Sequence, residues 1–314
     1  MSKQYLTAHV AANAHEFDIY GLAVTPKYVL TASGDSSIKL WETGNPEHIL
    51  AHEFRGAHPL GAHHIAVNRN TGTIAASVGY SGEIVLWDLE NLKQLHRIET
   101  KDQDDIRGFW AIALSPAGDR LFGVNCHGRI AIWDTANPQK ALTDLSTKSS
   151  FGTALDVSPD GNLVASGHQN GDVFVFNTNT NKMHHCLHGL TTPIRTVKFS
   201  PGGKLLAVAG DSMVISLFDV ASGDLVNNLT GHSAIVFSVA WNPVGDHVIS
   251  GSVDGKVKVW SVDTFQCVAT QNEASLAIYS VQTIPKGSGI GDGFIAVGAN
   301  KNIYYYRESA GEQA

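Results

Sequence analysis

Seven aromatic residues, each near the end of a β-strand-like run, recur along this 314-residue chain at intervals of 42 to 46 residues. They are Trp41, Trp87, Trp133, Phe176, Phe218, Trp260 and Tyr306. Four of the runs read IKLWET, IVLWDL, IAIWDT and VKVWSV, which are short apolar runs typical of strands, and in VKVW apolar and polar residues alternate. A repeat of this length predicts an all-β, seven-bladed β-propeller, in which each repeat forms one four-stranded blade.

The repeat that ends at Trp260 shows the expected layout of a blade. Residues 235–241 form the first strand, 247–252 the second, 257–260 the third and 265–269 the outer fourth strand. Turn-forming residues separate these runs, and equivalent turns such as SPDG and SPGG recur in other repeats.

The ends of the chain predict how the ring closes. The seventh repeat stops after its third strand, whereas a strand-like segment at about 5–11 precedes the first repeat. We expect this segment to complete the last blade, because the pairing hides sheet edges that an open ring would expose. The expected organisation is one propeller over residues 1–308 and a short polar tail over 309–314.

Composition disfavours several classes of partner. The net charge is −7 and no basic stripe occurs, so direct nucleic-acid binding is not expected. No stretch of about 20 apolar residues and no apolar leader is present, so no membrane association is expected. Cytoplasmic localisation, with a nuclear pool as well, is the resulting expectation. The three cysteines lack the spacing of a zinc site, and no cofactor is predicted.

Histidine is frequent, with 15 residues, which raises the question of a metal site. The adjacent pairs His63–His64 and His184–His185 fall in predicted strands, where neighbouring side chains point to opposite faces. No third ligand follows at a turn or helical spacing, so no metal site is predicted.

Turn and strand positions resemble those of WD-repeat proteins, and the resemblance gives two polar sets a structural role. In that family a histidine, a strand hydroxyl, a turn aspartate and the strand tryptophan hydrogen-bond to one another and lock the blade. The matching sets are His15, Thr31, Asp35 and Trp41 in the first repeat, and His232, Ser250, Asp254 and Trp260 in the sixth. A Ser-His-Asp catalytic site would need only one such set, so we expect no catalytic residues and no enzyme activity.

One position per blade is expected to lie at the rim of the top face, the face formed by the loops that enter each blade and join its second and third strands. These positions are Tyr20, His63, Trp110, Thr153, Arg195, Phe237 and Tyr279. Aromatic residues and arginine dominate binding hot spots, so all of these residues except Thr153 are predicted to contact a partner. The alternative is that their rings pack between neighbouring blades.

An acidic loop enters the third blade beside this rim. Asp102, Asp104 and Asp105 are predicted to pair with a cation on the partner, preferably a guanidinium group. A loop that is only solvated remains the alternative.

Three segments resemble a particular WD-repeat group, the WD-repeat subunit of the superkiller (Ski) complex and the small WD-repeat protein shared with the polymerase-associated factor complex. They are IVLWDLENLKQLHRI (84–98), TPIRTVKFSPGGKLLAVAGD (192–211) and the run from GHSAIVFSVAW to FQCVAT (231–270). Chain length and blade count also fit, so the resemblance covers essentially the whole chain.

The resemblance implies a non-catalytic scaffold. Such a propeller binds a tetratricopeptide-repeat subunit and supports a helicase that feeds messenger RNA to the exosome for 3′-to-5′ decay. Its top face binds partner segments of the form Gln-Arg-x-x-hydrophobic, and a fungal branch connects it to meiotic recombination. An adaptor in another assembly, such as a transcription, chromatin or ubiquitin-ligase complex, remains the alternative.

Overall fold

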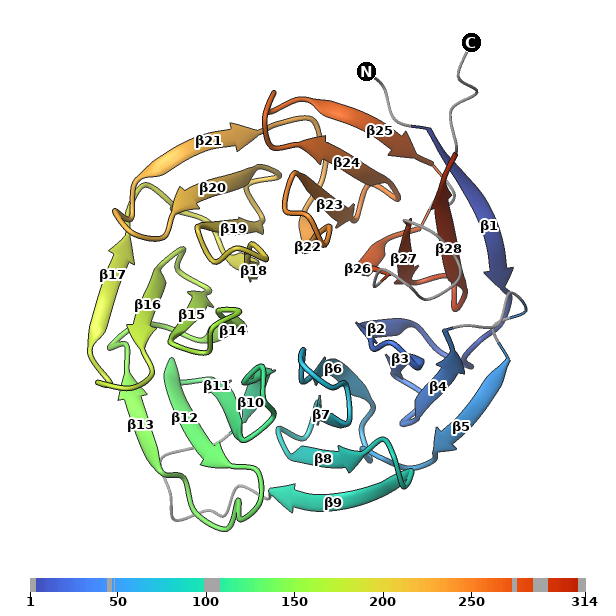
Figure 1. Ribbon diagram of the computed structural model, residues 1–314, viewed down its shortest axis with the longest axis horizontal. Coiled ribbons are helices and arrows are strands. Elements are labelled where there is room, and N and C mark those ends of the chain that lie inside the picture. Colours follow the sequence, from blue (N-terminus) through green and yellow to red (C-terminus); the bar gives the residue numbers. More distant parts are fainter. Residues whose placement is uncertain are drawn as a thin grey trace.

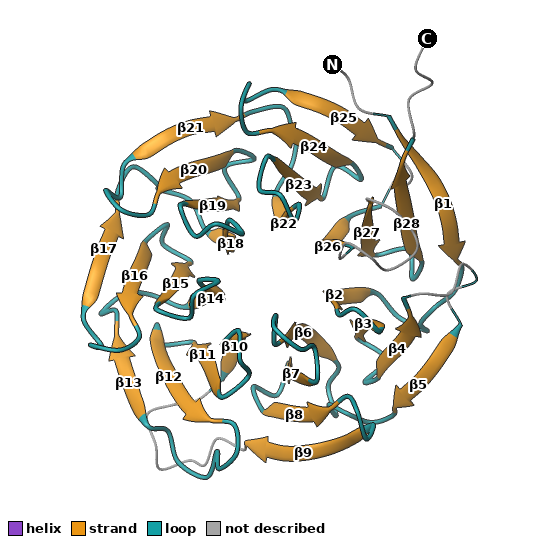
Figure 2. Ribbon diagram, viewed as in Figure 1, coloured by secondary structure: helices purple, strands orange, loops and turns teal. Residues whose placement is uncertain are grey.

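The protein folds into a ring of seven four-stranded antiparallel sheets around a central channel (Figure 1). This computed structural model describes residues 4–43, 47, 49–98, 108–272, 276–284 and 293–309. Strands and loops make up these residues, with no helix among them (Figure 2). The predicted all-β, seven-bladed propeller is therefore confirmed.

Each blade is a sheet whose first strand lies nearest the channel. Blades 1 to 3 comprise β2 (Ile19–Val24), β3 (Tyr28–Ser33), β4 (Ile38–Glu42), β5 (Leu50–Phe54), β6 (Ala62–Val67), β7 (Ile74–Gly79), β8 (Ile84–Asp88), β9 (Lys93–Ile98), β10 (Phe109–Leu114), β11 (Arg120–Asn125), β12 (Arg129–Asp134) and β13 (Thr143–Ser146). Blades 4 and 5 comprise β14 (Gly152–Val157), β15 (Leu163–His168), β16 (Val173–Asn177), β17 (Met183–Leu187), β18 (Ile194–Phe199), β19 (Leu205–Gly210), β20 (Ile215–Asp219) and β21 (Leu225–Leu229). Blades 6 and 7 comprise β22 (Val236–Trp241), β23 (His247–Ser252), β24 (Val257–Ser261), β25 (Cys267–Gln271), β26 (Ile278–Thr283), β27 (Gly293–Gly298), β28 (Ile303–Glu308) and β1 (Tyr5–Ala11).

The N-terminal strand closes the ring, as the sequence predicts. β1 pairs antiparallel with β28 in a register that places Tyr5 opposite Glu308 and Ala11 opposite Ile303. Figure 1 shows β1 as the outermost strand of the last blade, so the two ends of the chain share one sheet. This pairing covers the β28 edge that the seventh repeat would otherwise expose.

The core consists of apolar layers between neighbouring blades. Each of the seven hydrophobic clusters combines residues of two adjacent blades, including one that joins blade 7 to blade 1. The second strand of blade 1, β3, is buried at all six positions, because a neighbouring blade covers each face of its sheet. The seven periodic aromatics all lie in third strands and are all buried.

The largest difference from the expected layout of blade 6 is at its outer strand. β25 begins at Cys267, two residues later than predicted, because Phe265 adopts a left-handed turn conformation with φ of 56°.

No helix of the described residues is long and apolar enough to cross a membrane. The acidic loop with Asp102, Asp104 and Asp105, and residues 310–314 of the expected tail, lie outside the described residues.

Candidate functional site

The rim residues predicted from the sequence share one backbone feature. In the first strand of every blade the pairing register shifts at one residue, which marks a β-bulge. The seven bulged residues are Tyr20, His63, Trp110, Thr153, Arg195, Phe237 and Tyr279. A bulge leaves one residue outside the ladder and changes the direction of its side chain.

The seven bulged residues line a single cavity. It has a volume of about 360 Å³ and lies at the end of the channel where the first strands begin. This is the top face, so we call it the top-face cavity. The structure thus brings together residues from all seven blades, from Tyr20 in the first blade to Tyr279 in the last. Tyr80, which follows β7, also lines the cavity and was not predicted.

Aromatic rings contact one another around the rim. The ring centroid of Tyr279 lies 5.2 Å from that of Tyr20 and 5.5 Å from that of Phe237. On the other side, His63 lies 4.3 Å from Trp110 and 4.8 Å from Tyr80. Offset and edge contacts at such distances stabilise aromatic pairs. The rings therefore support one another at the mouth instead of packing only between blades.

Charged groups in the rim are already oriented. Arg195 donates two hydrogen bonds to Asp211, from Nε to Oδ1 at 2.7 Å and from Nη2 to Oδ2 at 3.0 Å. The same guanidinium lies 5.9 Å from the centre of the Phe237 ring. A paired arginine held over an aromatic ring offers a flat, rigid surface to a ligand.

Asp18 supplies negative charge near the tyrosines of the rim. Burial, and then the charge of Asp18, raise the pKa of Tyr279, and burial also raises the pKa of Tyr80. Both phenols therefore remain neutral and can hydrogen-bond to a partner. Asp18 was not predicted, because a single aspartate before a strand carries no distinguishing pattern. The predicted acidic residues Asp102, Asp104 and Asp105 lie outside the described residues.

The polar set of blade 6 is hydrogen-bonded as the family resemblance implies. Ser250 Oγ accepts a hydrogen bond from Trp260 Nε1 at 2.8 Å and lies 2.7 Å from His232 Nε2. His232 Nδ1 lies 2.9 Å from Asp254. Burial lowers the pKa of His232, so its imidazole is neutral near pH 7.

Blade 1 repeats this arrangement. Thr31 Oγ1 accepts from Trp41 Nε1 at 3.0 Å and lies 2.8 Å from His15 Nε2, while His15 Nδ1 lies 2.7 Å from Asp35. Burial alone would raise the pKa of Asp35, but hydrogen bonds from His15 and Ser37 hold it below its usual range. The hydroxyls and imidazoles of both sets are buried, so a substrate cannot reach them.

Blade 2 contains a related set that was not predicted from the sequence. His58 Nε2 lies 2.7 Å from Ser77 Oγ, which also accepts from Trp87 Nε1 at 2.8 Å. Glu83, which pairs with Arg97, lies 3.5 Å from His58 in place of a turn aspartate. The sequence GAH at 56–58 could have identified this set, because it places a histidine just before the blade.

The predicted geometry of the two histidine pairs was wrong. His63 and His64 both line the top-face cavity, and the rings of His184 and His185 lie 4.3 Å apart. Both pairs occur where the ladder register shifts, so the alternation of side chains is interrupted there. Among the described residues, no group of histidine, cysteine and acidic side chains is arranged to hold a metal ion.

Comparisons with known proteins agree with this architecture. The model of the WD domain, G-beta repeat, matches residues 6–42 and 223–261, and that of the anaphase-promoting complex subunit 4 WD40 domain matches 155–241. The meiotic recombination protein rec14 of Schizosaccharomyces pombe is 41% identical over 99% of this chain and all of its own length. The antiviral protein SKI8 of Saccharomyces cerevisiae is 25% identical over 99% of this chain and all of its own length.

Proposed function

The chain belongs to the WD-repeat family that includes rec14, and from this premise we propose that it is an adaptor that binds short segments of partner proteins in its top-face cavity. Propellers of this family mediate protein–protein interactions and are generally non-catalytic.

The observation that carries this proposal is the ring of bulged residues around one cavity. Trp110, Phe237 and Tyr279 are partly exposed at the mouth and are held in place by contacts with neighbouring rings. Rigid aromatic side chains bury a large area on binding and lose little conformational entropy. A cavity of about 360 Å³ can admit one or two side chains of a partner, but not a folded domain.

The chemistry of the rim suits a segment of the form Gln-Arg-x-x-hydrophobic, which the resemblance to the Ski-complex subunit implies. The carboxylate of Asp18 and the faces of Tyr20 and Tyr279 can receive a guanidinium group. The apolar residue of the segment would then pack against Phe237 and Trp110. The predicted contribution of Asp102, Asp104 and Asp105 remains part of this hypothesis.

Two assemblies follow from the relatives. The resemblance to SKI8 supports a scaffold role in the Ski complex, with a tetratricopeptide-repeat subunit and a helicase subunit as partners. The 41% identity to rec14 supports a second role in meiotic recombination. We propose that the same cavity serves both, which requires a cytoplasmic pool and a nuclear pool of the protein.

Calorimetric titration with a synthetic Gln-Arg-x-x-Leu peptide tests the binding mode. We expect saturable binding that weakens at least about tenfold in Phe237→Ala and in Trp110→Ala, because each removes a hot-spot ring. Leu225→Ala is the matched control: Leu225 is 51% exposed on the outer strand β21, far from the cavity, and its removal should leave affinity unchanged.

A peptide with alanine in place of arginine should bind more weakly to the native protein, and the loss should be smaller in Asp18→Asn, because only the contacts with the tyrosine rings remain. Equal binding of both peptides would contradict the proposed role of Asp18. Absence of binding by the native protein would contradict the Gln-Arg-x-x-hydrophobic binding mode and favour an adaptor role in another assembly. Affinity purification from vegetative and meiotic cells would then identify the assembly directly, by recovery of helicase and tetratricopeptide-repeat subunits or of recombination proteins.

A further inference from the structure

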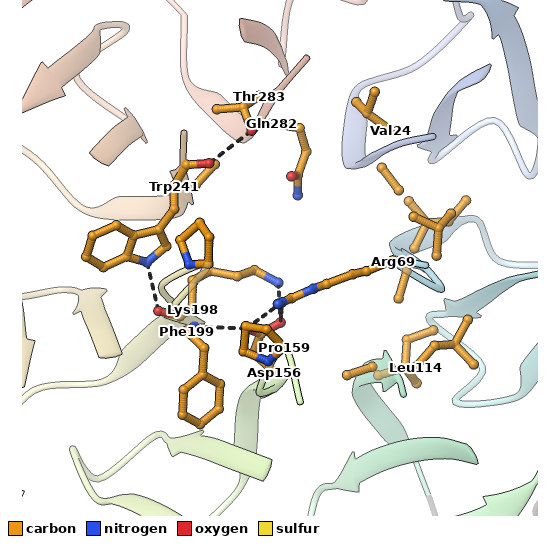
Figure 3. Close-up of a pocket in the computed structure, with 18 of the residues that line it drawn as sticks. Val24, Arg69, Leu114, Asp156, Pro159, Lys198, Phe199, Trp241, Gln282 and Thr283 are labelled. Atoms are coloured by element: carbon orange, nitrogen blue, oxygen red, sulfur yellow. Dashed lines mark hydrogen bonds and ion pairs between the residues drawn. The ribbon is translucent and has the colours of Figure 1, made fainter. Parts of the chain in front are cut away.

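A second cavity occupies the opposite end of the channel. It has a volume of about 350 Å³ and is lined by the far ends of the first strands and the turns that follow them, including Arg69, Pro159 and Pro201. We call it the lower cavity (Figure 3). His64, Lys198 and Gln282 line both this and the top-face cavity, so they lie where the two halves of the channel meet.

A buried carboxylate lies at the wall of the lower cavity. Asp156 is 3% exposed and accepts hydrogen bonds from Arg69 Nη2 at 2.9 Å, from Lys198 Nζ at 3.1 Å and from the Phe199 amide at 2.9 Å. Burial alone would raise the pKa of Asp156, but the charges of Arg69 and Lys198 lower it below its usual range. Asp156 is therefore ionised, and two cations face one carboxylate.

Several hydrogen-bond donors around the cavity are not used by the described part of the chain. Arg69 engages Asp156 through Nη2 alone, so its Nε and Nη1 groups make no hydrogen bond to a described residue. Lys198 uses one of its three donors. The amide of Gln282 makes no hydrogen bond within the described residues, and Figure 3 shows it pointing into the cavity along with Arg69 and Lys198.

His64 adds a further donor. Burial, and then the positive charge of Lys198, lower its pKa to about 3, so the imidazole is neutral. His64 Nδ1 accepts a hydrogen bond from the Ile112 amide at 3.3 Å, which places the proton on Nε2. The middle of the channel therefore presents N–H groups to whatever occupies it.

We propose that the lower cavity binds a carboxylate group. The Arg69–Lys198–Asp156 trio carries a net single positive charge, which one carboxylate neutralises and a phosphate dianion would exceed. The unused N–H groups of Arg69, Lys198 and Gln282 can donate hydrogen bonds to the two oxygens of one carboxylate. Apolar walls formed by Val67, Pro201 and Trp241 suit the carbon chain to which that group is attached.

Two sources can deliver a carboxylate to this site. One is a small organic acid, and the other is the acidic side chain of a partner segment inserted from the lower face. Both present the same group to the same donors, so the binding experiment must separate them.

Calorimetric titration of the full-length protein with sodium propionate, with an acetyl-Gly-Asp-Gly-amide peptide and with inorganic phosphate at constant ionic strength tests the proposal. We expect saturable binding of at least one carboxylate and none of phosphate. Binding should weaken about tenfold in Gln282→Leu, which removes a donor without breaking any hydrogen bond within the described chain. Arg69→Gln should weaken it further, and Phe237→Ala should leave it unchanged.

The ligands that bind identify the occupant of the lower cavity. Binding of propionate alone identifies a small acid as the occupant, and binding of the peptide alone identifies an acidic protein segment. Binding of phosphate with equal or greater affinity, no saturable binding of any carboxylate, or carboxylate binding that Gln282→Leu does not change would overturn the proposal. Gln282→Leu leaves Asp156 and its hydrogen-bond partners in place, so we expect the variant to fold. A circular dichroism spectrum and a melting temperature equal to those of the native protein would verify this.

Discussion

A single buried hydroxyl shows, at the scale of residues, why polar side chains are built into the blades. Ser250 is fully buried and connects Trp260 to His232, which in turn connects to the turn residue Asp254. A buried N–H group without an acceptor costs more free energy than a hydrogen bond normally contributes. The set therefore ties the third strand to the loop that enters the blade.

Replacement of this hydroxyl tests its role. Ser250→Ala should lower the free energy of unfolding by about 1–3 kcal/mol, because it leaves the indole N–H of Trp260 without an acceptor and Nε2 of His232 without a donor. In the Ser250→Ala background, Trp260→Phe should cost less than in the native protein, since its unpaired N–H is then absent. Urea unfolding of the two single variants and the double variant measures this, and strictly additive losses would contradict it.

The sequence predicted these hydrogen-bonded sets only where the histidine, the hydroxyl, the turn aspartate and the tryptophan were all present. Blades 1 and 6 follow the family pattern and were identified, whereas the blade 2 set uses Glu83 where a turn aspartate was expected and was missed. Asp18 was missed for another reason: its proximity to Tyr279 arises only when the first and last blades meet. Local spacing contains no information on such a contact.

At the scale of elements, the first and last strands decide whether the ring exists. The recurring apolar runs that end near an aromatic residue predicted the third strands, because short apolar runs bounded by turn-forming residues are typical of buried strands. The bulges in the first strands broke that period and reversed the prediction for His63 and His64. The seventh blade depends on β1, which contributes its outer strand from the opposite end of the sequence.

Removal of β1 tests ring closure. Deletion of residues 1–11 should expose the β28 edge and lower the free energy of unfolding by about 3–6 kcal/mol, at roughly 1 kcal/mol per lost ladder hydrogen bond. A synthetic peptide with the sequence of residues 4–11 should restore the melting temperature, whereas a peptide of the same composition in scrambled order should not. An unchanged melting temperature after deletion would show that β1 contributes little to closure.

At the scale of the whole molecule, closure concentrates neutral histidines along the channel and between blades. Burial lowers the pKa of both His58 and His63 to about 4 and that of His64 to about 3. In the unfolded chain these imidazoles bind protons near pH 6.5, so between about pH 6.5 and pH 4 the unfolded state binds more protons than the folded state. Stability is therefore greatest above this range and decreases as the pH falls through it.

The contribution of one histidine can be measured. His63→Gln should reduce the loss of unfolding free energy between about pH 7 and about pH 4.5 by roughly 2 kcal/mol, because glutamine does not titrate. Urea unfolding of the native and variant proteins at both pH values gives this difference, and effects of other titrating groups cancel in the comparison. Parallel pH profiles for the two proteins would contradict a lowered pKa of His63 in the folded state.

The sequence by itself determined the number of blades and the positions that face the channel mouth, because each repeat of 42 to 46 residues folds into the same local structure. It also determined the closing strand, because the seventh repeat lacks a fourth strand of its own. Only the tertiary structure decided what those positions form together. Side chains such as Arg69 and Asp156 are 87 residues apart and meet across the channel, and Tyr20 contacts Tyr279 only once the ring closes. Contacts between repeats depend on the curvature of the whole ring, which no single repeat specifies.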